Sequence, residues 1–257
     1  MKLLAIRILR SIIGYENIPY VKMLAAKYGL VKDFKALNYD YLTAKVIQKV
    51  LQPDSVAVDV GCHHGIILGI MMKYCTQGRL FAFEPLPKSY EYLVQQFNKP
   101  NIEIHNIALS DKQGNAKFNY VVNRPAYSGL QKREYPTSDE KVVEITVKTD
   151  LLDNILFDKT EKISLIKIDV EGAELQVLLG AKNILKRDKP IIVFEYGLGA
   201  AEYYGTNPED IYNLLCLECG LKISLLDLWL NGEKPFSQEE FKEQYYTRKN
   251  FLFIAYP

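Results

Sequence analysis

The chain has 257 residues, a length that suits one full-size α/β domain or two small ones. Its composition, 48% hydrophobic and 25% charged, is that of an ordinary soluble globular protein. The net charge of +1 gives no electrostatic reason to expect nucleic acid as a partner, because nucleic-acid binding depends on neutralising phosphates.

Residues 1–52 are predicted to form a helical addition in front of the main domain. The opening stretch, MKLLAIRILRSIIG, is apolar but carries basic side chains, so it is too short and too interrupted to span a membrane. It shows no signal-peptide cleavage site, and we expect an amphipathic helix docked on the domain, with a membrane-surface helix as the alternative. The spacing of apolar residues in 41–51 predicts a further helix that ends before Pro53.

From residue 55 the pattern changes to alternating strands and helices. The predicted strands are residues 55–61, 79–84 and 101–109, and the predicted helices are residues 66–75 and 89–97. This alternation is typical of βαβ units and therefore indicates a parallel sheet.

Residues 111–148 interrupt this alternation. The pattern predicts a turn and strand over 111–122, a polar loop over 123–140, and a further strand from Lys141. The loop is long enough to suggest a functional segment or lid. Tyr127 and its neighbours Ser128 and Gly129 are candidates for a ligand-facing surface, with plain solvent exposure as the alternative.

The α/β pattern then resumes and runs to the end of the chain. It predicts strands at 163–169, 190–196, 221–230 and 250–257, and helices at 173–185 and 208–220. No clear helix separates the two terminal strands, so we expect them to form an antiparallel pair at a sheet edge. The sequence thus predicts a Rossmann-like α/β domain with a seven-stranded, mostly parallel sheet.

The four cysteines have no spacing that indicates a disulfide framework, so we expect reduced thiols and a cytoplasmic protein. Cys216 and Cys219 form a C-x-x-C at the end of a predicted helix, where positions three apart share a face. No second pair of ligands follows, which favours a buried helix over a zinc or redox site.

The stretch VAVDVGCHHG, residues 56–65, joins a predicted strand to a predicted helix through a turn that contains Gly61 and Gly65. Glycine lets the backbone approach a ligand, and a helix start offers free N–H groups, so this turn is typical of an anion or nucleotide site. A metal site at Cys62 and the two histidines that follow is disfavoured, because adjacent side chains rarely aim at one point.

Glu84 ends the second predicted strand, about 20 residues after the second glycine of the turn. That is the expected place for a carboxylate that accepts two ribose hydroxyls; the alternative is a solvated glutamate at a strand end. Either a dinucleotide or S-adenosylmethionine fits. The spacing D-x-G-x-x-x-G lacks the G-x-G pair that pyrophosphate crosses, which favours S-adenosylmethionine, with Asp59 facing its ammonium directly or through water.

Four stretches together resemble the FkbM-type methyltransferases: VDVGCHHG, FAFEPLPKSYEYL, IHNIALSD and, most specifically, LIKIDVEGAELQVLLGA. The resemblance runs through most of residues 55–196. It implies that residues 53–257 form a class I S-adenosylmethionine-dependent methyltransferase domain that methylates a hydroxyl of a sugar, glycan or natural product, with S-adenosylhomocysteine as the other product. The family usually has Ala-Asn after the first glycine, where this chain has Cys62 and His63.

The resemblance also implies which residues bind the cofactor. The turn and Asp59 hold its amino-acid end, Glu84 its ribose, and Asn106 and Ile107 flank the adenine; a turn-forming role is the alternative for Asn106. The complete cofactor-binding set is Asp59, Gly61, Cys62, His63, Gly65, Glu84, Pro85, Asn106, Ile107 and Asp169.

Three acids are candidates for catalysis. Asp169 ends the fourth strand, beside the cofactor sulfur in the class I topology; Glu171 follows it, and Glu195 lies at the matching rim of the next strand. Asp169 or Glu171 could remove a hydroxyl proton, fix the acceptor or help to bind a cation, and Glu195 is a further candidate for a role in the site. The alternative is that Asp169 or Glu171 caps the helix beginning near Gly172. His63 and His64 are rival bases.

Two other functions remain open at this point: a nicotinamide-dependent oxidoreductase, and a non-catalytic module that keeps the fold. We expect a small-molecule or glycan acceptor as the partner. No metal-ligating residues are predicted, and the sequence leaves open whether a divalent metal is needed. The N-terminal helices are expected to cover the cofactor end or to form a homo-oligomer contact.

Overall fold

The computed structural model describes residues 17, 19, 21, 34–135, 139–160 and 162–257. The first predicted helix, and the cover or oligomer contact expected of the N-terminal helices, therefore lie largely outside the described residues. The second predicted helix, over 41–51, corresponds to the C-terminal part of α3 (Phe34–Val50) and ends one residue earlier than predicted. The proposed domain boundary after residue 52 stays a prediction. Within the described part of the chain, no helix combines the length and apolar character needed to cross a membrane.

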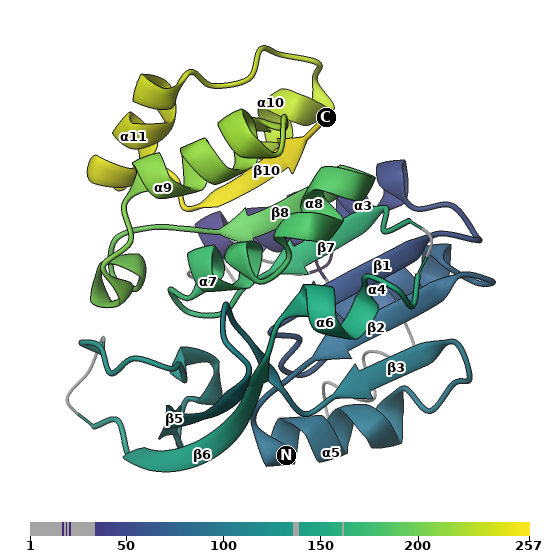
Figure 1. The fold of residues 1–257 in the computed structure, drawn as a ribbon, viewed down its shortest axis with the longest axis vertical. Helices are drawn as coiled ribbons and strands as arrows, with labels where there is room; N and C mark the ends of the chain where they lie inside the picture. Colours follow the sequence, from purple (N-terminus) through teal and green to yellow (C-terminus); the bar gives the residue numbers. More distant parts are fainter. Residues whose placement is uncertain (1–16, 18, 20, 22–33, 136–138, 161) are drawn as a thin grey trace.

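The main sheet has seven strands in the order β3-β2-β1-β7-β8-β10-β9 (Figure 1). They are β1 (Val56–Val60), β2 (Arg79–Phe83), β3 (Ile102–His105), β7 (Leu165–Ile168), β8 (Ile191–Glu195), β9 (Lys222–Ser224) and β10 (Leu252–Tyr256). The first five run parallel, and β10 lies antiparallel between β8 and β9. The predicted seven-stranded, mostly parallel sheet with an antiparallel terminal edge is confirmed.

Helices cover both faces of this sheet. Besides α3 they include α4 (Ile66–Tyr74), α5 (Pro87–Gln96), α6 (Leu152–Leu156), α7 (Glu174–Leu179), α8 (Lys182–Asp188) and α9 (Pro208–Tyr212). Successive side chains of β1 point to opposite faces. Val58 therefore packs in the core that contains α7 and α8, while Ala57 packs in the core that contains α3 and α4. Burial on both faces explains why the central strands are apolar almost throughout.

A second sheet accounts for the interruption at residues 111–148, and the sequence pattern did not predict it as a unit. Its strands, β4 (Ala108–Leu109), β5 (Gly114–Val121) and β6 (Val142–Asp150), are ordered β4-β6-β5, with β5 and β6 antiparallel. Figure 1 shows β5 and β6 extending to one side of the main sheet. The single strand predicted over 101–109 was wrong: the chain turns at Asn106, and only β3 belongs to the main sheet.

The C-terminal region also contains helices that the pattern did not reveal. Between β9 and β10 lie α10 (Leu226–Leu230) and α11 (Gln238–Tyr246), so the prediction of no helix there was wrong. A capping box of Ser237 and Glu240 starts α11, a signal that is present in the sequence. The antiparallel pairing of β9 with β10 is confirmed. Cys216 lies in the helical segment Asn213–Glu218 and is a free thiol, as is Cys219.

Candidate functional site

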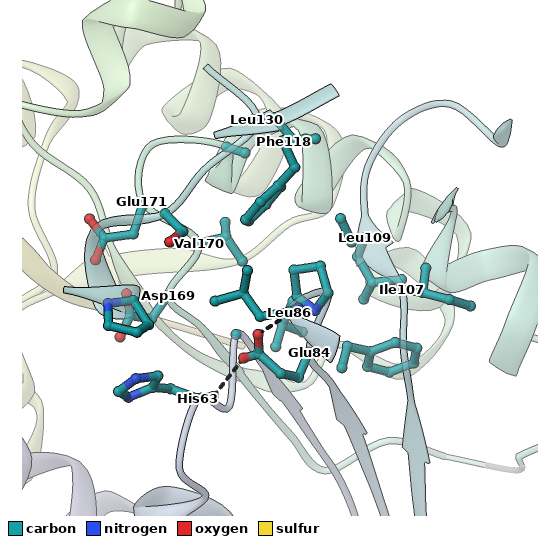
Figure 2. Close-up of a pocket in the computed structure, with 18 of the residues that line it drawn as sticks. His63, Glu84, Leu86, Ile107, Leu109, Phe118, Leu130, Asp169, Val170 and Glu171 are labelled. Carbon is teal, nitrogen blue, oxygen red and sulfur yellow. Dashed lines mark hydrogen bonds between the residues drawn. The ribbon is translucent and has the colours of Figure 1, made fainter. Parts of the chain in front are cut away.

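A cavity lies at the carboxyl ends of β1, β2 and β7, where the second sheet and its loop close over the main sheet. The space between its walls, with the open solvent at its mouth included, is about 740 Å³. Figure 2 shows His63, Asp169 and Glu171 on one side, Ile107 and Leu109 on the other, and Phe118 with Leu130 above. We call it the first cavity.

Gly61 brings the end of β1 against the end of β7. Its φ is 73°, and a Cβ there would lie 1.9 Å from the backbone oxygen of Asp169, so only glycine fits. The N–H groups of Gly61 and Cys62 donate to the carbonyl of Phe83, at 2.9 and 3.3 Å. These two N–H groups are therefore already hydrogen-bonded within the protein. Gly61 and His63 are the residues of the turn that line the first cavity.

Two other residues of the turn do not line the first cavity. Gly65 has φ 70° and ends the turn against Phe97; a Cβ there would lie 2.5 Å from the Phe97 ring. The Cys62 side chain is buried and its thiol donates to the Phe83 carbonyl at 3.6 Å. Their predicted contacts with a cofactor stay predictions, and the structure shows that both residues shape the turn.

Glu84 lies at the floor of the first cavity. Its Oε2 accepts the N–H of His63 at 2.8 Å and its Oε1 accepts that of Leu86 at 3.0 Å (Figure 2). Burial raises the pKa of Glu84 to about 7, and these two hydrogen bonds oppose the rise. Each oxygen retains an acceptor position, so the carboxylate fits a ribose diol.

The wall beside Glu84 is apolar and suits a flat heterocycle. Leu86, Ile107 and Phe118 line it. Asn106 does not: its amide nitrogen donates to the carbonyls of Glu84 and Pro85, at 2.8 and 3.0 Å. This is the turn-forming role given as the alternative, and it holds the strand ends that shape the cavity.

The loop predicted as a lid covers the first cavity. Pro125, Ala126, Ser128 and Leu130 line it, and Ser128 accepts the N–H of Val121 at 3.0 Å, which ties the loop to β5.

A second cavity adjoins the first, and Glu171 lines both. Its other lining residues include Arg133, Glu174, Glu195, Tyr196 and Arg248. The Arg133 guanidinium, from the lid loop, pairs with the Glu171 carboxylate. Arg133 also donates to the Gly199 carbonyl at 3.3 Å and lies over the Tyr127 ring.

The turn after β7 is held by Glu174. Its Oε1 accepts the N–H groups of Val170 and Gly172, both at 3.2 Å, while Glu171 takes the left-handed conformation with φ 59°. The residue before α7 is Ala173, and no side chain caps the helix. The alternative that Asp169 or Glu171 caps this helix is therefore wrong.

Three acids converge where the two cavities meet. Asp169 lines the first cavity and Glu195 the second, with Glu171 between them. Burial raises the pKa of Glu171 to about 8, Asp169 adds to the rise, and Arg133 opposes it. Burial, followed by Asp169 and Glu171, raises the pKa of Glu195 well above its ordinary value.

Lys167 lies among these acids. Its Nζ is 3.4 Å from Asp169 Oδ2 and 3.5 Å from Asp59 Oδ1, and it donates to the Gly61 carbonyl at 3.2 Å. Asp59 is fully buried and does not line the first cavity, so its contact with a cofactor ammonium stays a prediction.

Several site residues were not predicted from the sequence. Lys167 could have been identified, because it is a charged residue inside an apolar strand and lies two positions before Asp169. Glu174 could have been identified as an acid in the first turn of a predicted helix. Nothing in the sequence indicates Arg133 or Phe118, because only the tertiary arrangement brings the loop and β5 over the sheet. Across the described residues, no group of three or more His, Cys, Asp or Glu side chains is arranged to hold a metal ion.

Comparison with known proteins gives a consistent family. The family model described as the methyltransferase FkbM domain matches residues 59–223. The chain is 29% identical over 152 residues to methyltransferase sdnD of Sordaria araneosa, covering 48% of this chain and 59% of that protein. It is 28% identical over 172 residues to the hexuronic acid methyltransferase AglP of Haloferax volcanii, covering 66% and 65%. The chain thus spans less than two thirds of either relative.

A solved structure is also similar. The crystal structure of methyltransferase FkbM from Methylobacillus flagellatus is 15% identical, with a TM-score of 0.49, covering 93% of this chain and 59% of that one.

Proposed function

The chain belongs to the methyltransferase FkbM domain family, and from this premise we propose that it transfers the methyl group of S-adenosylmethionine to a hydroxyl of a sugar, glycan or natural-product acceptor. Methyl transfer follows from the family, and the sheet has the class I methyltransferase order. The observation that carries the choice of cofactor is Glu84, a buried carboxylate at the floor of the first cavity beside an apolar wall.

When bound, S-adenosylmethionine supplies a methyl group that its sulfonium already activates. The chain's own part is to bind, orient and exclude water. Glu84 would accept the two ribose hydroxyls, and Leu86, Ile107 and Phe118 would hold the adenine. These side chains fit the cofactor because they combine the two carboxylate oxygens of Glu84, which accept hydrogen bonds, with an apolar surface for the adenine ring.

The acceptor binds in the second cavity in this proposal. Glu171 lines both cavities, so a hydroxyl held there reaches the end of β7. Asp169, Glu171 and Glu195 are hydrogen-bond acceptors for hydroxyl groups, and one of them removes the proton. A positioned base contributes about 10²–10⁴-fold to the rate. The relative named as a hexuronic acid methyltransferase supports a sugar-like acceptor.

Methyl transfer from labelled S-adenosylmethionine into a cell extract tests the function, followed by identification of the labelled product. We expect label in a hydroxyl-bearing small molecule or glycan, as a methyl ether. Label in no product, with S-adenosylhomocysteine binding intact, would favour a non-catalytic module. Binding of a nicotinamide dinucleotide but not S-adenosylhomocysteine would favour an oxidoreductase.

A further inference from the structure

Lys167 is a lysine almost removed from solvent, with 12% of its side chain exposed, at the rim of the sheet. It is flanked by Asp59 from β1 and by Asp169 after β7, and its third contact is the Gly61 carbonyl. Burial lowers the pKa of Lys167, but Asp169 and Asp59 raise it more, so the ammonium stays charged.

The two partners of Lys167 differ in access. Asp59 has no exposed surface, whereas 34% of the Asp169 side chain is exposed and lines the first cavity. The contact with Lys167 uses Asp169 Oδ2, which leaves Oδ1 for an acceptor hydroxyl. A charge-assisted contact fixes one carboxylate oxygen in place, and a positioned general base needs a free oxygen within reach of the proton that it takes.

The other two acids are less suited to this role. Glu171 is engaged by the Arg133 guanidinium, and its side chain is 22% exposed. Burial and the neighbouring acids favour the protonated form of Glu195, which can then donate a hydrogen bond but not accept a proton. The charged and titratable groups that surround Asp169 are Lys167, Asp59, Glu171, Glu174 and Glu195.

We propose that Lys167 is a positioning residue that fixes the Asp169 carboxylate in place at the wall of the first cavity, so that Asp169 rather than Glu171 or Glu195 accepts the hydroxyl proton. The inference rests on the proposed function and adds the choice of base to it. Lys167 itself touches neither acceptor nor reacting atoms; it acts through Asp169.

Carboxyl-carbon NMR of aspartate-labelled protein tests the inference without turnover, with the Asp169 signal assigned from Asp169→Asn. In Lys167→Met the Asp169 signal should move or broaden, because the contact that fixes its carboxylate is lost. In Lys167→Arg it should stay near the wild-type position. An unchanged Asp169 signal in Lys167→Met would overturn the inference.

Turnover gives the second readout. We expect Lys167→Met to lower kcat by about tenfold or more, with little change in the acceptor KM. Lys167→Arg should recover most of the rate. A change in KM without a fall in kcat, or no recovery by arginine, would overturn the inference.

Folding of the variants is checked by thermal unfolding. If Lys167→Met does not fold, because Asp59 is left as an unpaired buried charge, the double variant Asp59→Asn, Lys167→Met removes both charges. The same change in the Asp169 signal is expected there, since the contact with Lys167 is lost in both variants. Absence of methyl transfer by the wild-type protein would overturn the proposed function, whereas an unchanged Asp169 signal would overturn this inference even where transfer is observed.

Discussion

At the scale of single residues, Gly61 shows how a local conformation builds the site. Its left-handed φ and the 1.9 Å at which a Cβ would approach the Asp169 oxygen are separate constraints. Gly232 has a similar φ of 77° but open space around it, which makes it a matched control.

Gly61→Ala should therefore destabilise the protein by about 3 kcal/mol or more, since both backbone strain and a backbone clash arise. Gly232→Ala should cost about 1 kcal/mol, because it brings only the strain. Urea unfolding of both variants measures the difference. Equal losses of unfolding free energy would show that β1 and β7 do not approach each other as closely as described.

Asp169 is the residue on which the catalytic account depends most. Asp169→Asn keeps the shape of the side chain but removes its ability to take a proton, so kcat should fall by about 10²–10⁴-fold. Asp54, an exposed acid near the opposite rim of β1, supplies the control variant Asp54→Asn, which should keep wild-type turnover. Full turnover by both Asp169→Asn and Glu171→Gln would show that neither acid is the base.

At the scale of elements, the lid loop is attached to the main domain by few contacts. Arg133 pairs with Glu171 and donates to the Gly199 carbonyl, and the N–H of Gln131 donates to the Tyr204 hydroxyl at 3.1 Å. These contacts link the loop to the turns that follow β7 and β8, so they close the roof of the first cavity.

Arg133→Met should loosen this attachment, because the charge pair and the hydrogen bond to Gly199 are lost together. Hydrogen exchange of the loop amides should become about tenfold faster, by local opening rather than by global unfolding. The neighbouring exposed residue gives the control Lys132→Met, which should exchange as the wild type does. Equal exchange in both variants would mean that Arg133 does not hold the loop.

The sequence predicted the elements of the main sheet well and those outside it poorly. Strands buried on both faces appear as apolar runs, and β1, β2, β7 and β8 were all found in this way. The β4–β6 sheet was not anticipated as a unit, because β5 and β6 carry many exposed residues and their pairing depends on long-range contacts. The helix α11 could have been found from its capping box.

In the candidate site, too, the residues at the ends of the main strands were predicted, and those held in place by loops and turns were not. Glu84 and Asp169 were found because each ends an apolar strand, at the rim where parallel strands place their ligands. Asn106 could equally have been a ligand contact or a turn residue, and only the structure shows its hydrogen bonds to two carbonyls. Arg133 could not be found, because nothing in a polar loop indicates which side chain will reach a buried glutamate.

At the scale of the whole molecule, buried acids should govern the pH dependence of stability. Burial raises the pKa of Glu84 and Glu174 to about 7 and that of Glu171 to about 8. In the unfolded chain they ionise near 4.5, so the folded state binds more protons between these values. Stability from these groups is fully present below about pH 4.5 and is lost as the pH rises to about 8.

The melting temperature should accordingly fall between about pH 5 and 8. Glu174→Gln should flatten this slope, because the amide oxygen can still accept the two backbone N–H groups while the ionisation is removed. Glu209, an acid of α9 whose pKa is lowered by its hydrogen bond with Lys242, offers the control Glu209→Gln, which should not flatten the slope in this range. A melting temperature that rises from pH 5 to 8 would contradict this account.

The central claim is that a nucleoside cofactor occupies the first cavity with its ribose on Glu84, and calorimetric titration with S-adenosylhomocysteine tests it most directly. The wild-type protein and Glu209→Gln should bind one molecule with equal affinity, and Glu84→Gln should bind about tenfold more weakly, since one carboxylate acceptor is lost. No binding by the wild type, or equal binding by a folded Glu84→Gln protein, would contradict the claim.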